Sequence, residues 1–367
     1  MASGSSADVV VIGAGVIGCS VAYYLARAGA RVEVVERGEI GREASWAAAG
    51  MISAPPFSDD PIGRFYRAGA ALFPEFDRRI REETGVEIGY HRCGSLHVCR
   101  RPEEWREWEA EHAALAAIGD PVELWSAADV RARTPGLASD IVGALFYPDA
   151  AQVRPPRLVR ALAAGAARRG VTFRTGEPVV GFARSGDRVT GVVTPRETIA
   201  CGTAVVAAGA WSGEIGQFLG VPLPMEPARG QIVLLEAVPP RLSPLIFDGD
   251  FYLTPRPDGK VLLGSTVEFV GFDRGTTPEG VAELLGNGLD VAPGLRGSRF
   301  VTAWAGLRPC AGNRGPILGP VPGCEEVVLA TGHFRTGISP ALITGRLIAD
   351  WITIRRTEIP LAPFAPG

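Results

Sequence analysis

The sequence lacks any long apolar run and any N-terminal leader pattern. No stretch approaches the roughly 18 apolar residues that a membrane span needs. Residues 1–6 read MASGSS and contain no basic segment followed by an apolar core. We therefore expect no contact with a membrane and a cytoplasmic location.

A surplus of charge of either sign is also missing. The 37 Lys and Arg residues nearly balance the 40 Asp and Glu residues, which leaves a net charge of −3. Nothing in this balance favours nucleic acid or an anionic lipid surface as a partner. The 367 residues, 46% of them hydrophobic, are enough for two ordinary domains or one large composite.

Cysteine and histidine are scarce, with six and four residues. No Cys-x-x-Cys pair occurs, and no histidine stands at metal-ligand spacing from a cysteine. We expect no metal site and interpret most of the cysteines as small buried side chains. His112 shares a helical stripe with Trp105, Trp108 and Leu115 and is interpreted as a packing residue.

Near its start the chain contains a glycine-rich turn that directly follows an apolar run. Residues 9–12 (VVVI) predict a strand, and Gly13, Gly15 and Gly18 follow with the spacing Gly-x-Gly-x-x-Gly. The first glycine permits a sharp turn, the second lets backbone N–H groups approach a pyrophosphate, and the third lets the next helix pack on the strand. The N-terminus of that helix then faces the anion.

Glu36 closes the next predicted strand, residues 31–35, and stands 23 residues after Gly13. A carboxylate at this position is expected to hold the ribose hydroxyls of the nucleotide. Strand, glycines, helix, strand and acid together predict a dinucleotide-binding unit. No second Gly-x-Gly-x-x-Gly follows a later strand, so we expect no separate NAD(P)H domain. Electrons should then come from the organic substrate.

Two runs of small residues leave alternatives open. Residues 39–51 (EIGREASWAAAGM) are either a tightly packed helix start or a second nucleotide-contact segment that lets a flavin approach. Residues 204–212 (AVVAAGAWS) are either a strand tip beneath the bound dinucleotide or a buried strand before a turn.

The remaining pattern predicts helices and parallel strands around a middle portion of short antiparallel strands. Ser126 is predicted to open a short helix with a capping box. Ser339 and Pro340 are predicted as the N-cap and first residue of the last helix, which runs to about residue 354. Further strands are predicted at 94–98, 171–174, 178–183, 189–194, 230–236, 245–247, 251–254, 261–264 and 326–330, and further helices at 72–83, from 102 and at 157–169.

Five features stand in order along the chain: the loop 13–18, Glu36, residues 47–51 (AAAGM), residues 304–309 (WAGLRP) and residues 332–338 (GHFRTGI). Together they resemble the D-amino-acid oxidase superfamily of flavoproteins, most closely glycine oxidase of the thiamine-biosynthesis type. The resemblance implies an α/β fold in which a Rossmann-like FAD-binding domain is interleaved with an antiparallel-sheet substrate domain. The implied FAD-binding segments are 1–85, 150–215 and 300–367, and the implied substrate-binding segments are 86–149 and 216–299.

The resemblance also implies noncovalently bound FAD, since no cysteine stands at a recognised attachment position. The expected FAD-binding residues are Gly13, Gly15, Val16, Ile17, Gly18, Glu36, Arg37, Ala44, Ser45, Ala49, Gly50, Met51, Val179, Gly209, His333, Phe334, Arg335, Thr336, Gly337, Ile338 and Ser339.

Substrate is expected to meet Arg308, Tyr252 and Arg335. Arg308 offers a planar fork for a carboxylate, the alternative being a structural salt bridge. Tyr252 offers a hydroxyl donor to the same group, the alternative being an ordinary sheet aromatic. Arg335 could hold the substrate, gate the site or only brace its loop.

The implied activity is hydride transfer from the Cα of glycine or an N-substituted glycine to flavin N5. The resulting imine would be hydrolysed to glyoxylate and an amine, and O2 as acceptor would give hydrogen peroxide. The alternatives are an oxidase or dehydrogenase of sarcosine or of a larger glycine-bearing metabolite, and a flavoprotein subunit that is not an oxidase. The oligomeric state stays open, a homo-oligomer included.

The sequence departs from glycine oxidases at Thr336, at Ser339-Pro340, at Cys310, where Gly is usual, and at Val267, where a longer side chain is usual. The departures at Thr336, Ser339, Pro340 and Val267 predict an enlarged substrate pocket, in which an N-substituted glycine reacts at least as well as glycine.

Overall fold

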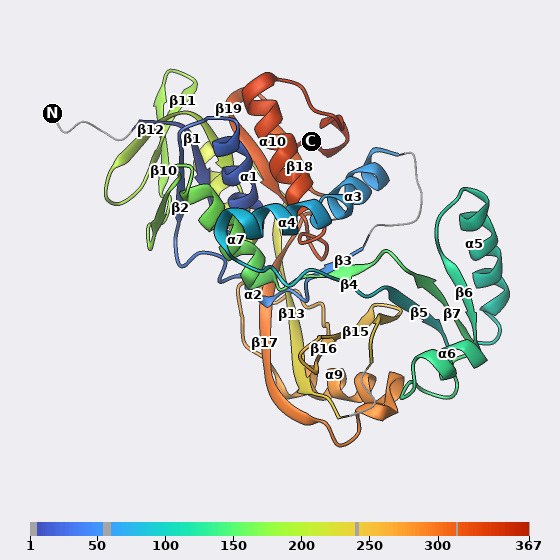
Figure 1. Ribbon diagram of the computed structural model, residues 1–367. Helices are drawn as coiled ribbons and strands as arrows, with labels where there is room; N and C mark the ends of the chain where they lie inside the picture. The colour runs from blue at the N-terminus through green and yellow to red at the C-terminus, as the bar shows by residue number, and fades with distance from the viewer. Residues whose placement is uncertain (1–5, 54–59, 239–241, 313–314, 367) are drawn as a thin grey trace.

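The computed structural model describes residues 6–53, 60–238, 242–312 and 315–366. Residues 1–5, on which the expected location partly rests, lie outside the described residues. Within the described ranges, no helix is long and apolar enough to cross a membrane. Figure 1 shows the first and last elements, β1 and α10, in one region of the molecule and the strands β13, β15, β16 and β17 in the other.

The first region is built on a sheet with a parallel centre. Its strand order is β10-β11-β12-β1-β2-β9, with β19 paired to β12 and β18 to β19. β1 lies between β12 and β2, parallel to both. The strands are β1 (Ser6–Ile12), β2 (Val32–Glu36), β9 (Thr172–Thr175), β10 (Gly181–Ser185), β11 (Arg188–Val193), β12 (Thr198–Val206), β18 (Ile317–Val321) and β19 (Cys324–Thr331).

Helices cover this sheet, and α1 lies at their centre because it packs on both α10 and α7. Gly345 permits the close crossing with α1, since a Cβ at this position would lie 2.2 Å from the Ser20 Oγ. Tyr23 and Leu25 of α1 are fully buried in the resulting core. The helices of this region are α1 (Val16–Arg27), α3 (Pro61–Ala71), α4 (Phe73–Thr84), α7 (Pro155–Ala167), α8 (Ser212–Leu219) and α10 (Ala341–Ile354).

The second sheet has the order β17-β13-β16-β15-β14-β5-β7-β6. Its pairs are antiparallel except for β14 and β5, which run parallel. Its strands are β5 (Ser95–Cys99), β6 (Glu123–Ser126), β7 (Gly143–Tyr147), β13 (Glu226–Glu236), β14 (Leu245–Asp248), β15 (Phe251–Pro255), β16 (Lys260–Gly264) and β17 (Arg299–Cys310), and its helices are α5 (Trp105–Ala117), α6 (Ala127–Arg133) and α9 (Pro278–Val291).

Short elements connect the two regions. The short helix α2 (Ala44–Ala47) packs on β17. A small sheet joins β3 (Met51–Ile52), β8 (Ala151–Gln152) and β4 (His91–Arg92). The segment that follows the phosphate loop and β2 is thereby held against the second sheet.

The predicted α/β class and the predicted antiparallel middle portion agree with these two sheets. The capping box at Ser126 is present, with its hydroxyl accepting from the Asp129 N–H. β17 was not predicted as a strand, and it belongs to the second sheet although the predicted boundary at residue 300 assigns nearly all of it to the FAD-binding segments. The division into domains stays a prediction.

The predicted start of the last helix is wrong. α10 begins at Ala341, and its N-cap is Pro340. The Ser339 hydroxyl instead donates to the Ser53 carbonyl at 2.9 Å. The side chain that the pattern assigned to a cap thus ties the loop to the segment after β3.

Candidate active site

A cavity of about 920 Å³ lies where residues of both sheets meet. The first region contributes the start of α1, the small-residue segment and the loop before α10. The second sheet contributes residues of β5, β13, β14, β15 and β17. The predicted site residues that line the cavity are Gly15, Val16, Ile17, Ala44, Ser45, Ala49, Gly50, Met51, Gly209, Tyr252, Arg308, His333, Phe334, Arg335, Thr336, Gly337, Ile338 and Ser339.

The phosphate loop has the geometry that its glycines predict. Gly13 has φ +103°, and a Cβ there would lie 2.5 Å from the Ala207 carbonyl oxygen. A Cβ on Gly18 would lie 1.9 Å from the Gly13 carbonyl oxygen. The first turn of α1 contains no acidic residue, so nothing offsets the partial positive charge at its N-terminus. This cradle fits the diphosphate of a dinucleotide.

The small-residue segment is tightly packed, as its first interpretation requires, and its contact with a flavin stays a prediction. Ala47 packs so closely on β17 that a Cβ on Gly306 would lie 2.5 Å from the Ala47 Cβ. The same segment lines the cavity, and the Ser45 hydroxyl accepts from the Val16 N–H at 2.9 Å. The packing of α2 therefore brings backbone next to the phosphate loop. The run that begins at residue 204 likewise ends β12 and adds Ala207 and Gly209 to the cavity wall.

Glu36 is buried at the end of β2, and its carboxylate accepts from the Ala14 and Gly38 N–H groups, each at 2.8 Å. The Arg37 guanidinium lies 4.1 Å from the centre of the Trp211 ring. Val179 packs against the apolar cluster beneath β2. These three residues do not line the cavity, and their contact with a nucleotide stays a prediction.

Arg308 reaches the cavity from β17 and is held by oxygens of the segment after β16. Its Nη1 donates to the Thr266 carbonyl at 3.0 Å, and its Nη2 donates to the Ser265 Oγ at 2.8 Å. Gly230 on β13 makes the room, because a Cβ there would lie 1.9 Å from the guanidinium. Within the described part of the chain, no carboxylate forms an ion pair with Arg308. The structural salt bridge considered as its alternative role is therefore not found.

Tyr252 lies beside Arg308 on the cavity wall. Burial lowers the pKa of Arg308, and the interaction with Tyr252 acts against that effect. Gly264, opposite Tyr252 on β16, is required because a Cβ there would lie 2.5 Å from the ring. The two side chains thus form one face, with a fixed cation and a hydroxyl that both point at the same space.

Arg335 differs from Arg308 because it already has a carboxylate partner. Its Nη1 donates to the Asp250 Oδ1 at 2.6 Å, and its Nη2 donates to the Asp250 carbonyl at 3.1 Å. The Asp250 side chain is 90% exposed and that of Arg335 is 28% exposed. This pair links the loop before α10 to the turn between β14 and β15, which favours a bracing or gating role.

The loop before α10 is held by contacts with α10 and α3. His333 is buried, its Nε2 lies 3.0 Å from the Thr344 Oγ1, and burial lowers its pKa to about 3. His333 is therefore neutral at ordinary pH. The Thr336 hydroxyl lies 2.8 Å from the Tyr66 hydroxyl.

The sequence did not predict a row of aromatic rings along the cavity. His97 stacks on Phe247 with 4.5 Å between ring centres, and Tyr147 meets His97 edge-on at 5.0 Å. Phe247 in turn lies 6.3 Å from Tyr252. Burial lowers the pKa of His97 to about 4, so this ring is neutral as well. The predicted strand 94–98 contains His97, but no local signal pairs that strand with β14.

The argument for an enlarged pocket needs a correction. Val267 is 40% exposed and does not line the cavity, and neither do Cys310 and Pro340. Only Thr336 and Ser339 among the departing residues lie on its wall. His97, Tyr147 and Phe247 of the aromatic row line the cavity as well.

Comparison with known proteins gives consistent matches over nearly the whole chain. The DAO family model, described as FAD-dependent oxidoreductase, matches residues 8–351. A glycine oxidase of Pseudomonas aeruginosa is 37% identical over 366 residues, which cover 99% of this chain and 99% of that protein. The crystal structure of glycine oxidase from Geobacillus kaustophilus has a TM-score of 0.93 at 31% identity and covers 98% of each chain. That of an iminodiacetate oxidase from Chelativorans sp. has a TM-score of 0.88 at 28% identity, also over 98% of each chain.

Proposed function

The chain belongs to the DAO family of FAD-dependent oxidoreductases, and from this premise we propose that it oxidises glycine or an N-substituted glycine. Membership confirms the resemblance predicted from the sequence, and with it FAD as the cofactor. The glycine oxidases among its relatives support an amine or amino acid as the substrate.

One observation carries the proposal: Arg308 is a cation in the cavity wall without a carboxylate partner in the described structure. Its hydrogen bonds go to a carbonyl and a hydroxyl, which orient the guanidinium but do not neutralise it. A substrate carboxylate would supply the missing negative charge and would accept two parallel hydrogen bonds from the guanidinium. The Tyr252 hydroxyl would donate to the same group.

Anchoring the carboxylate fixes the position of the neighbouring Cα. FAD, when bound, would supply the acceptor of the hydride and return its electrons to O2. The role of the chain is then to orient the C–H bond and to keep water away. In this way the free energy of substrate binding is used to raise the rate of the reaction. His97 and His333 are weak bases, because burial lowers the pKa of His97 to about 4 and that of His333 to about 3. A substrate amine that enters in its neutral form would need no base from the chain.

The aromatic row supports a substrate larger than free glycine. His97, Phe247 and Tyr147 continue the cavity wall beyond Tyr252, where an N-substituent would pack on ring faces. Iminodiacetate, named in one similar structure, is itself an N-substituted glycine. We therefore propose that N-substituted glycines are used at least as efficiently as glycine, with glyoxylate and an amine as products.

Anaerobic mixing of the holoenzyme with glycine, sarcosine, N-ethylglycine and D-alanine tests this function. Loss of the yellow flavin colour with the glycines, followed by peroxide when oxygen is admitted, is the expected result. Flavin reduction without peroxide would indicate a dehydrogenase or an electron-transferring subunit. A preference for glycine of more than tenfold over every N-substituted compound would refute the larger substrate.

A further inference from the structure

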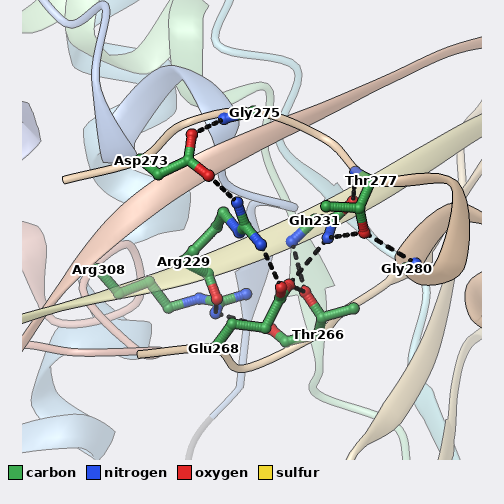
Figure 2. Close-up of polar contacts among 9 residues, drawn as sticks. All are labelled: Arg229, Gln231, Thr266, Glu268, Asp273, Gly275, Thr277, Gly280 and Arg308. Carbon is green, nitrogen blue, oxygen red and sulfur yellow. Dashed lines mark hydrogen bonds and ion pairs between the residues drawn. The ribbon is translucent and has the colours of Figure 1, made fainter. Parts of the chain in front are cut away.

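A network of charged side chains lies directly behind Arg308. Figure 2 shows the guanidinium of Arg229 between the carboxylates of Glu268 and Asp273. Arg229 stands on β13, is only 4% exposed, and pairs with Glu268 at 2.5 Å and with Asp273 at 2.5 Å. None of these three side chains lines the cavity.

Both oxygens of the Glu268 carboxylate are engaged. Oε2 accepts from Arg229, while Oε1 accepts from the Thr266 hydroxyl at 2.5 Å and from the Gln231 amide at 2.9 Å. Burial acts to raise the pKa of Glu268, but these hydrogen bonds outweigh it and hold the pKa below its usual range. Glu268 is therefore a charged carboxylate at every ordinary pH.

Glu268 and Arg308 both form hydrogen bonds with Arg229 and with Thr266. The Arg229 carbonyl accepts from the Glu268 N–H at 2.9 Å and from the Arg308 Nη1 at 3.5 Å. Thr266 contacts Arg308 through its carbonyl and Glu268 through its hydroxyl. The negative charge of Glu268 acts on Arg308, since it opposes the lowering of the Arg308 pKa by burial. They nevertheless form no ion pair, since the carboxylate is turned toward Arg229 (Figure 2).

We propose that Arg229 is a positioning residue that keeps Arg308 available for substrate by binding the carboxylate of Glu268. This inference rests on the proposed function, in which Arg308 binds the substrate carboxylate. Arg229 would not touch the substrate. It would act by occupying the internal anion that otherwise competes for Arg308.

The proposal predicts that the effects of substitutions at Arg229 and Glu268 on carboxylate binding are not additive. Without Arg229, Glu268 would be a partly buried carboxylate deprived of its main cation, and Arg308 is the neighbouring guanidinium that could replace it. A substrate carboxylate would then have to displace Glu268. Removing Glu268 as well would free Arg308 again. A purely structural role for the ion pair predicts instead that Arg229→Gln lowers the thermal stability of the protein without a specific loss of carboxylate binding by the folded holoenzyme.

The affinity of the holoenzyme for acetate measures the availability of Arg308 without any catalysis. Acetate binding is monitored through the change that it causes in the flavin absorption spectrum. The variants are Arg229→Gln, Glu268→Gln, the double variant and Arg308→Gln. Asp273→Asn is the matched control, since it removes the other partner of Arg229 and leaves the pair with Glu268. We expect Arg229→Gln to weaken acetate binding about tenfold or more, and Glu268→Gln, Asp273→Asn and the double variant to stay within about threefold of the parent protein.

Failure of the double variant to recover acetate binding would overturn the proposal. If Arg229→Gln does not fold, Arg229→Lys decides instead, because its ammonium can still bind Glu268 and should keep acetate affinity within about threefold. A tenfold loss in Arg229→Lys would equally refute the proposal. If Arg308→Gln binds acetate as well as the parent protein, the carboxylate site itself is wrong, and the proposed function fails by a separate route.

Discussion

Replacing Arg308 by Ala removes the side chain on which the proposed substrate site depends. The guanidinium is held by the Thr266 carbonyl and the Ser265 hydroxyl and has no carboxylate partner in the described structure. A substrate carboxylate would lie in the same partly desolvated space, so it would lose the cation that the proposed site provides for it. Truncating one member of such a pair costs about 2–5 kcal/mol.

That range corresponds to a fall in kcat/KM of about 30-fold to about 5,000-fold. The assay is peroxide production from sarcosine, with bound FAD quantified to show that the cofactor site is intact. Arg335→Ala is the matched control, because Arg335 already pairs with the exposed Asp250. Because Asp250 already occupies the Arg335 guanidinium, we expect Arg335→Ala to lower kcat/KM less than Arg308→Ala does. An Arg308→Ala variant that keeps the parent kcat/KM, or one that is no worse than Arg335→Ala, would refute the reasoning.

Three further outcomes follow from the same site. Acid precipitation should release all of the FAD into the supernatant, because none of the cysteines stands at a recognised attachment position; yellow colour in the pellet would contradict noncovalent binding. Flavin reduction at low substrate concentration should speed up as the pH rises toward the pKa of the substrate amine, and His97→Phe or His333→Ala should not abolish it; a loss of several orders of magnitude with FAD still bound would identify a protein base. Thermal stability should fall as the pH drops from about 6.5 toward 4, because buried His97 (pKa about 4) and His333 (pKa about 3) bind protons more readily in the unfolded chain than in the folded one. His97→Phe should flatten that decline, and an unchanged slope would show that His97 is not a source of it.

Local chemistry explains which features could be predicted from the sequence. The Gly13–Gly18 loop was predictable because Gly13 adopts φ +103° and Gly18 lies directly against the Gly13 carbonyl oxygen, five residues away. The capping box at Ser126 was predictable for the same reason, since its partner Asp129 stands three residues away. In both cases the residues that decide the structure are close in the sequence.

Features that depend on distant residues could not be predicted in this way. Ser339 has the sequence pattern of a helix cap, but its hydroxyl binds the carbonyl of Ser53 from another segment. His97 gains its place in the cavity wall only because β5 pairs with β14, about 150 residues later. β17 was missed because its residues are only partly buried and show no clean alternation.

The two arginines of the predicted substrate site, Arg308 and Arg335, differ in a way that the sequence does not reveal. Both stand in motifs of the family and have the same side chain, so the pattern alone predicts carboxylate binding equally for both. The difference is in their partners: the protein provides Asp250 for Arg335, whereas the neighbouring carboxylate of Arg308, Glu268, is bound to Arg229. A guanidinium acts as a binding site for an external anion only when the internal anions around it are already paired. The proposed function of Arg308 therefore depends on the pairing of two other side chains, Glu268 and Arg229, and neither of them lies in its motif.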